Sequence, residues 1–145
     1  MSETHSEIRF LVVDLGPTRL GLAMDHVAEV FALGPMASLP WSPDCAIGAI
    51  YRGGRVVTVV NLATFLALGE AKEPSIGVLV EHAEYAVAFA VQGVEVVEGR
   101  QTVMTSDVRL YLEDAQLIVA SLSTPHFDFH QIDLNRLLSA IAEAF

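Results

Sequence analysis

The pattern of apolar and polar positions is clearest in residues 40–66, PWSPDCAIGAIYRGGRVVTVVNLATFL. Two apolar runs, residues 46–51 and 56–60, flank a pair of glycines, Gly53 and Gly54. Such a pair between β-branched runs is typical of a two-residue hairpin loop, because both loop positions need a positive φ. Asn61, a good helix N-cap, follows, and the apolar residues after it have helical spacing. The segment therefore predicts a strand, a tight turn, a second strand and a short capped helix.

The same pattern predicts further short strands along the chain. They are expected at residues 8–15, 19–24, 76–81, 85–91, 108–112, 117–122 and 127–132. Residues 25–31 have valines at helix-like spacing but are too few for a helix to be assigned, and residues 99–105 are expected to form a loop. Asp133 is expected to cap a final helix over residues 134–145, whose leucines share one face. Short strands at regular spacing, with helices at only two equivalent places, predict an all-β fold of small barrels.

The chain contains an internal repeat. One constant shift along the sequence moves Asn61 onto Asp133 and the apolar residues after Asn61 onto those after Asp133. In the first part of the chain, a second and slightly shorter shift moves Val30 onto Val97. Two copies of one plan of strands, hairpin and helix would produce this similarity. Chance similarity between short valine-rich segments is the alternative.

Composition and charge narrow the classes of partner. The chain has 145 residues, of which 52% are hydrophobic, so one domain with a sizeable core is expected over residues 1–145. A net charge of −10, with Lys72 as the only lysine, argues against binding to nucleic acid or to an anionic membrane. No apolar run is long enough to span a bilayer. The single Cys45 cannot form an internal disulfide, which fits a reducing cytoplasm.

Sequence motifs for catalysis or cofactor binding are absent. There is no phosphate-binding loop, no Cys-x-x-Cys and no nucleophile elbow, so neither an enzyme nor a cofactor is expected. His126, Asp128 and His130 are spaced to share one face of a strand, and two histidines with a carboxylate are credible metal ligands. The favoured interpretation is a solvated outer face opposite an inward pair, Phe127 and Phe129. A small metal- or ligand-binding barrel is the alternative.

Four segments, taken together, resemble the CheW coupling-protein family. They are LAMDHVAEV (residues 22–30), Leu39-Pro40, IGAIYRGGRVVTVVNL (residues 47–62) and IDLNRLL (residues 132–138). The resemblance implies a mainly β fold of two intertwined five-stranded barrels, each similar to a src-homology-3 barrel. The barrels would share an apolar seam, with short helices and a C-terminal helix. Residues 1–145 would then form one CheW-like domain made of two pseudo-repeated subdomains.

The resemblance also implies a function. Members of this family are not enzymes: they bridge the tips of chemoreceptors to the histidine kinase CheA. By this resemblance, receptor binding would use the groove between the barrels, at Val27, Glu29 and Val30 together with the hairpin. Kinase binding would use the barrel ends, where turn residues present apolar side chains.

The hairpin turn departs from the family pattern. The family's Arg-Gly turn aligns with Gly53 and Gly54, so Arg52 lies one residue early and faces Arg55 across the turn. In the family, the turn arginine pairs with the glutamate that Glu29 matches. We therefore hypothesise that Glu29 reaches the Arg52–Arg55 pair. A diverged scaffold that binds only one of the two partners, or that serves a pathway other than motility, is the alternative.

Overall fold

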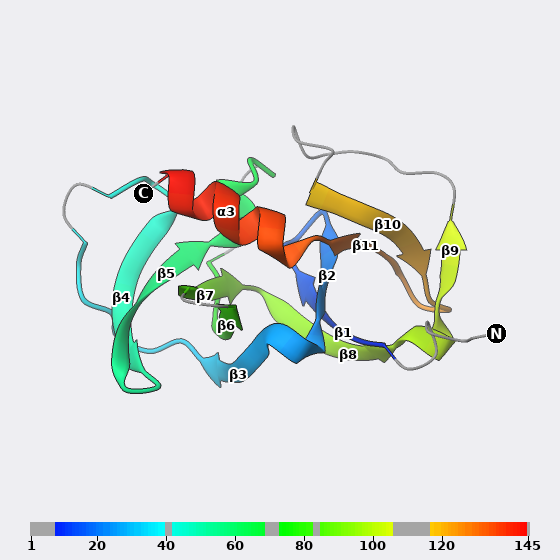
Figure 1. Cartoon of the computed structure of the whole chain (residues 1–145), viewed down its shortest axis with the longest axis horizontal. Coiled ribbons are helices and arrows are strands. Elements are labelled where there is room, and N and C mark those ends of the chain that lie inside the picture. Colours follow the sequence, from blue (N-terminus) through cyan, green and yellow to red (C-terminus); the bar gives the residue numbers. More distant parts are fainter. Residues whose placement is uncertain (1–7, 40–41, 69–72, 83–84, 106–116, 145) are drawn as a thin grey trace.

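The computed structural model describes residues 8–39, 42–68, 73–82, 85–105 and 117–144 (Figure 1). The predicted strand at residues 108–112 and part of the linker, residues 40–41, lie outside the described residues. The elements are β1 (Arg9–Asp14), β2 (Arg19–Ala23), η1 (Met24–His26), β3 (Val27–Ala32), β4 (Ala46–Arg52), β5 (Arg55–Asn61), α2 (Leu62–Phe65), β6 (Ile76–His82), β7 (Tyr85–Val91), β8 (Gly93–Glu98), η2 (Gly99–Gln101), β9 (Val103–Thr105), β10 (Ile118–Ser123), β11 (Asp128–Ile132) and α3 (Leu134–Ala144).

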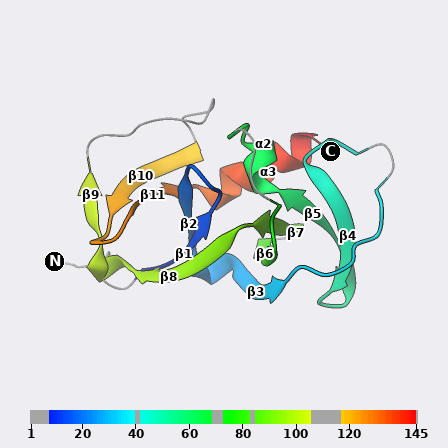
Figure 2. The same ribbon diagram turned by 180° about the vertical axis from the view of Figure 1, so that it is seen from behind.

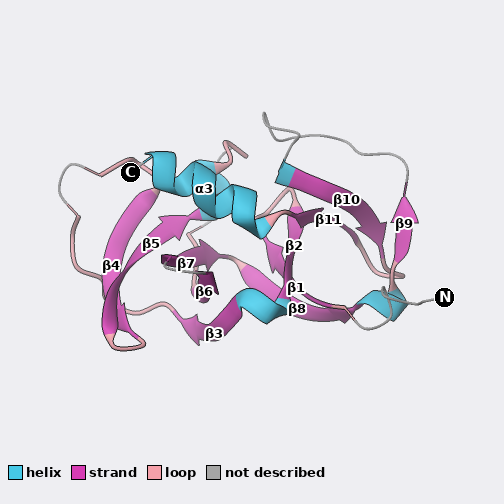
Figure 3. Ribbon diagram, in the orientation of Figure 1, coloured by secondary structure: helices cyan, strands magenta, loops and turns pink. Residues whose placement is uncertain are grey.

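The mainly β prediction is confirmed, and the strands form two sheets (Figure 3). The first sheet has the order β8-β1-β2-β11-β10-β9 and the second β3-β6-β7-β5-β4. The first sheet thus has six strands rather than the five expected, because β9 forms inside the segment predicted to be a loop. Among the described residues, no hydrogen-bonded ladder joins the two edge strands of either sheet, so each is a curled open sheet rather than a closed barrel.

The two sheets exchange one strand each, which confirms the intertwined arrangement. β1 and β2 pair with each other, and η1 then carries the chain across to the second sheet, where β3 pairs with β6. In the opposite sense, β8 follows β6 and β7 but pairs with β1 of the first sheet. The first sheet therefore occupies one half of the molecule and the second sheet the other, as both views show (Figures 1 and 2).

The two halves repeat fine details of their hydrogen bonding. β4 and β10 each contain an irregularity after their first residue, at equivalent positions of the repeat. The amide N of Asn61 donates to the carbonyl O of Cys45 at 2.7 Å, and Asp133 N donates to Leu117 O at 2.7 Å. The shift that moves Asn61 onto Asp133 also moves Cys45 onto Leu117, so the two hydrogen bonds are equivalent.

β3 and β8 are also equivalent strands of the two halves. A β-bulge near the start of β3 changes which of their residues correspond, compared with the constant shift read from the sequence. Their partners β6 and β1 are themselves equivalent strands, so the residues that face them can be compared position by position. Beyond the bulge, Val30 takes the place of Val96, not of Val97 as the sequence shift predicted. By the same comparison, Glu29 is the structural counterpart of Glu95.

The bulge also explains why residues 25–31 have helix-like spacing. Val27 faces Val80 and Val30 faces Val78, and both partners belong to the same buried cluster. In a regular strand, residues three apart point to opposite faces. The extra residue of the bulge puts Val27 and Val30 on the same face. The segment therefore forms η1 and β3 rather than a helix, because its pairing with β6 decides its conformation.

The largest core lies between the two sheets and is shared by them, as the seam of the predicted fold requires. It contains side chains from both sheets and from both helices, among them Leu11, Leu20, Val60, Val78, Phe89, Leu62 and Leu137. α3 begins beside β11 of the first sheet and extends over the second sheet (Figure 1). Asn61 and Asp133 cap the two helices as predicted, since their side-chain oxygens accept from Thr64 N at 3.3 Å and Arg136 N at 3.2 Å. Helix α3 thus ties the two halves together.

Candidate interaction surface

The β4–β5 hairpin has the predicted two-residue loop. Gly53 and Gly54 have φ values of 59° and 80°, a region that side chains with a Cβ rarely adopt. Arg52 and Arg55 are directly opposed, as the loop length requires. Two like charges therefore face each other at the end of the hairpin, an arrangement that is mildly destabilising unless carboxylates lie nearby.

Arg52 contacts strand β3 through two side chains. Its Nη2 lies 3.6 Å from Oε2 of Glu29, and its Cζ lies 4.1 Å from the centre of the Phe31 ring. We call Arg52, Glu29 and Phe31 the β3 latch, because they join the hairpin to the exchanged strand. An exposed ion pair and a surface cation–π contact each contribute less than about 1 kcal/mol. The contact with Glu29 was hypothesised from the sequence, whereas the role of Phe31 was missed.

Arg55 pairs with a different carboxylate. Its Nη2 lies 2.6 Å from Oε2 of Glu81 on β6. The hypothesis that Glu29 reaches both arginines is therefore wrong for Arg55. Glu81 could not be found from the sequence, because nothing in its neighbourhood shows that β6 approaches the hairpin end. The two ion pairs link the end of the hairpin to β3 and to β6.

Val27, Glu29 and Val30 lie on two different faces of β3. Val27 and Val30 face the seam side, where Val27 is half-buried against the shared core and Val30 remains 42% exposed. Glu29 faces Leu79, which belongs to the core inside the second sheet, so its side chain lies on the hairpin side. The structure thus brings Glu29 to Arg52 but places Val30 at the edge of the seam.

Comparison with known proteins decides the family of the chain. The model of the CheW-like domain family matches residues 9–119. The chain belongs to the CheW-like domain family.

The chain is also similar to two named proteins. Over 71 residues the chain is 32% identical to Protein FrzA of Myxococcus xanthus, a match that covers 49% of this chain and 44% of FrzA. The chain therefore aligns with less than half of that relative. Its fold is similar to that of the scaffolding protein TtCheW from Thermoanaerobacter tengcongensis, with a TM-score of 0.73 and 20% identity. That match covers 88% of this chain and 89% of TtCheW.

This CheW-like domain exposes an apolar pair on the outer face of the same hairpin. Tyr51 and Val56 face each other across β4 and β5 and are 70% and 74% exposed. Their neighbours Arg52 and Arg55 face the opposite side, toward the carboxylates. The sequence predicts that Tyr51 and Val56 belong to apolar strands, but no feature of the sequence indicates that this face is exposed.

Only two of the three candidate metal ligands near the C-terminus lie on a strand. Asp128 and His130 lie on β11, while His126 precedes it in the turn. His130 Nδ1 is 2.8 Å from Oγ of Ser121 on β10, and burial lowers the pKa of the His130 imidazole. In the part of the chain that the structure describes, no three His, Cys, Asp or Glu side chains gather as a metal site. As predicted, Phe129 is buried on the opposite face.

No helix in the described ranges is long and apolar enough to cross a bilayer.

Proposed function

We propose that this CheW-like chain is a cytoplasmic, non-enzymatic adaptor that couples chemoreceptor tips to a CheA-type histidine kinase. The observation that carries the proposal is the family match over residues 9–119. The fold similarity to a scaffolding protein over most of both chains supports it. So does the presence of two separate exposed apolar sites, one at Val30 and one at Tyr51 and Val56, because an adaptor needs two surfaces that can be occupied together.

The edge of the seam is the proposed receptor-binding surface. Val30 is exposed there beside the half-buried Val27, which gives a small apolar strip backed by the shared core. Glu29 lies on the other face of the same strand and is held by Arg52. The β3 latch would keep β3 in one position, which lowers the conformational cost of binding an extended or helical segment.

The outer face of the hairpin is the proposed kinase-binding surface. Tyr51 and Val56 present an exposed apolar pair at the end of the second sheet. Exposed aromatic side chains on a rigid backbone are frequent anchors of protein–protein interfaces. The ion pairs of Arg52 and Arg55 hold the hairpin from its inner side, so this pair would be preorganised for docking.

A scaffold that binds only one of these partners is the second candidate. The observation that favours it is the turn itself, since Gly53 and Gly54 offer no side chain where the family carries an arginine. Against it, Arg52 reaches Glu29 from the neighbouring position and so retains the pairing of charges.

Two binding titrations with matched controls test the proposal. Val30→Asp should weaken binding to a purified receptor-tip fragment by at least about tenfold, and Tyr51→Ser should weaken binding to the kinase regulatory domain equally. Val119→Asp and Tyr85→Ser, which change other exposed side chains of the same types, should bind both partners normally. Binding of one partner alone by the wild-type chain would favour the second candidate. Binding of neither would refute the proposal.

A further inference from the structure

A cavity of about 440 Å³ opens in the half of the molecule formed by the first sheet. It is lined by residues 95–97 of β8, by Gln101 and by residues 124–126 of the turn between β10 and β11. Its size is within the range of pockets that hold small ligands or single side chains. Neither proposed binding surface described above uses this cavity.

The strand that lines the cavity is the counterpart of β3. Register places Glu95 where Glu29 lies in the second half, and Val97 where Phe31 lies. Glu29 and Phe31 are the two residues of the β3 latch that receive Arg52. The cavity therefore has a carboxylate and an apolar side chain in the arrangement that accepts an arginine elsewhere in the same chain.

The turn that lines the cavity is the counterpart of the β4–β5 hairpin loop. The shift that moves Asn61 onto Asp133 places Thr124 at the position of Arg52. The short Thr124 side chain folds back onto its own turn, where Oγ1 accepts from His126 N and Phe127 N, each at 3.1 Å. It cannot extend to β8, so the space that Arg52 fills in one half is the open cavity in the other.

The other arginine of the hairpin does have a substitute in the first half. Phe127 takes the place of Arg55 by the same shift, and the Arg19 guanidinium stacks on its ring at 4.8 Å. That side of the turn is therefore fixed by a cation–π contact instead of the Arg55–Glu81 ion pair. On the other side of the turn, opposite β8, the first half has no such substitute for Arg52 among the residues that line the cavity.

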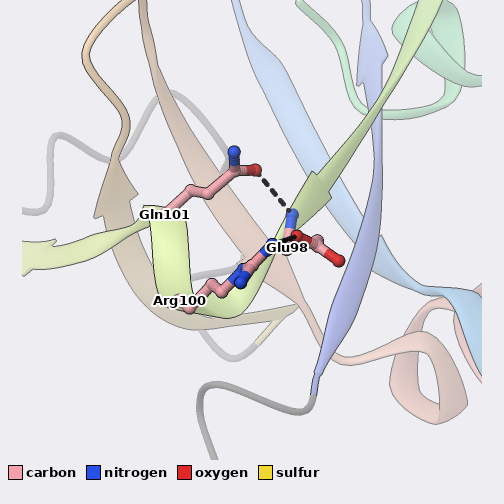
Figure 4. A network of polar contacts seen from close by, with 3 residues as sticks. All are labelled: Glu98, Arg100 and Gln101. Atoms are coloured by element: carbon pink, nitrogen blue, oxygen red, sulfur yellow. Dashed lines mark hydrogen bonds and ion pairs between the residues drawn. The ribbon is translucent and has the colours of Figure 1, made fainter.

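The remaining wall of the cavity is fixed by η2 (Figure 4). Gln101 Oε1 accepts from Glu98 N at 3.2 Å, and Arg100 Nε donates to the Glu98 carboxylate at 2.9 Å. Glu98 is thus neutralised by its own neighbour. Glu95, in contrast, has no ion-pair partner among the described residues, which leaves one carboxylate in the lining to attract a cation.

We propose that this cavity accepts an arginine side chain from a partner protein, in the place that Arg52 occupies in the other half. The guanidinium would pair with Glu95, and its aliphatic stem would lie against Val97. Arginine fits better than lysine because its planar guanidinium can donate two parallel hydrogen bonds to one carboxylate, here that of Glu95. The inference rests on the proposed function only in that a scaffold is expected to bind proteins.

Binding of a short peptide to the full chain tests the inference. The probe is an acetylated, amidated pentapeptide with arginine at its centre between Gly-Ser and Ser-Gly, and its control carries citrulline, which has the same shape without the charge. In ¹H–¹⁵N NMR spectra, the arginine peptide should shift the amide signals of residues 95–97 and of Gln101. The citrulline peptide should bind at least about tenfold more weakly.

Three variants separate this site from general attraction to an acidic protein. Glu95→Gln should abolish the preference for arginine, while Glu143→Gln, the same change on exposed α3, should leave it intact. Thr124→Arg should fill the cavity from within and block the peptide. If a thermal melt shows that Thr124→Arg does not fold, the two glutamate variants decide.

Equal binding of both peptides, or shifts confined to residues away from the cavity, would overturn the inference. Such a failure would not refute the adaptor proposal, because receptor and kinase binding are measured in separate titrations of the wild-type chain. Conversely, peptide binding by a chain that binds neither receptor nor kinase would refute the adaptor proposal alone.

Discussion

Reversal of the charge at Glu29 should weaken receptor binding while leaving the stability of the fold nearly unchanged. Glu29→Lys replaces the carboxylate that pairs with Arg52 by a cation at the centre of the β3 latch. The proposed receptor-binding strip, Val27 and Val30, belongs to the same strand. The variant therefore perturbs the latch that positions the proposed interface and changes no side chain of the buried cores.

The expected cost to folding is small. The Arg52 Nη2 to Glu29 Oε2 distance is 3.6 Å, and the two side chains are 36% and 43% exposed. At this exposure the pair is worth less than about 1 kcal/mol, and the repulsion that replaces it is screened by water and salt to a similar size. The long lysine side chain can also turn away from Arg52. We expect the melting temperature to fall by no more than about 4 °C.

The expected cost to binding is larger. A partner that covers β3 removes water from the latch, so a misplaced charge there is less screened than in the free protein. Receptor-tip affinity should fall at least about tenfold, or about 1.4 kcal/mol. Calorimetric titration against a receptor-tip fragment, beside a thermal melt, measures both quantities, and Glu143→Lys serves as the control for charge. Unchanged affinity would refute the role of the β3 latch in receptor binding, and a large loss of stability would instead mark Glu29 as structural.

Four further variants test the description of the fold. Phe129→Ala should cost about 3–5 kcal/mol in chemical denaturation, because this ring is buried over Gly21, and the half-buried Phe127→Ala should cost less; equal costs would contradict the burial. Burial holds the pKa of His130 below its ordinary value, so the unfolded chain binds a proton more readily. Stability should therefore decrease as the pH is lowered from about 7 to about 5.5, and His130→Asn should reduce that slope. Asn61→Ala should cost about 1 kcal/mol in a urea melt through the lost N-cap, and no loss would refute that role.

Local chemistry explains why much of the fold could be predicted from the sequence. The glycine pair fixes the hairpin loop, and Asn61 and Asp133 begin their helices, because these residues act on their immediate neighbours. The repeat could be recognised because both copies keep the same register and the same caps.

Contacts between distant strands explain most of what could not be predicted. The helix-like spacing of Val27 and Val30 is produced by a bulge that exists only because β3 pairs with β6. Arg55 meets Glu81 for the same reason, since the exchange of β3 and β8 decides which strands approach the hairpin. The contact of Arg52 with Glu29 could be predicted, because the resemblance to the CheW family pairs the hairpin turn with the position of Glu29.

Simultaneous binding of both partners is the property that defines a coupling protein. The most direct measurement is the mass, by light scattering after size exclusion, of a mixture of this chain, a receptor-tip fragment and the kinase regulatory domain. The proposed adaptor predicts a single species that contains all three, since the seam edge around Val30 and the hairpin face around Tyr51 are separate surfaces. Displacement of one partner by the other, or binding of one alone, would contradict the account.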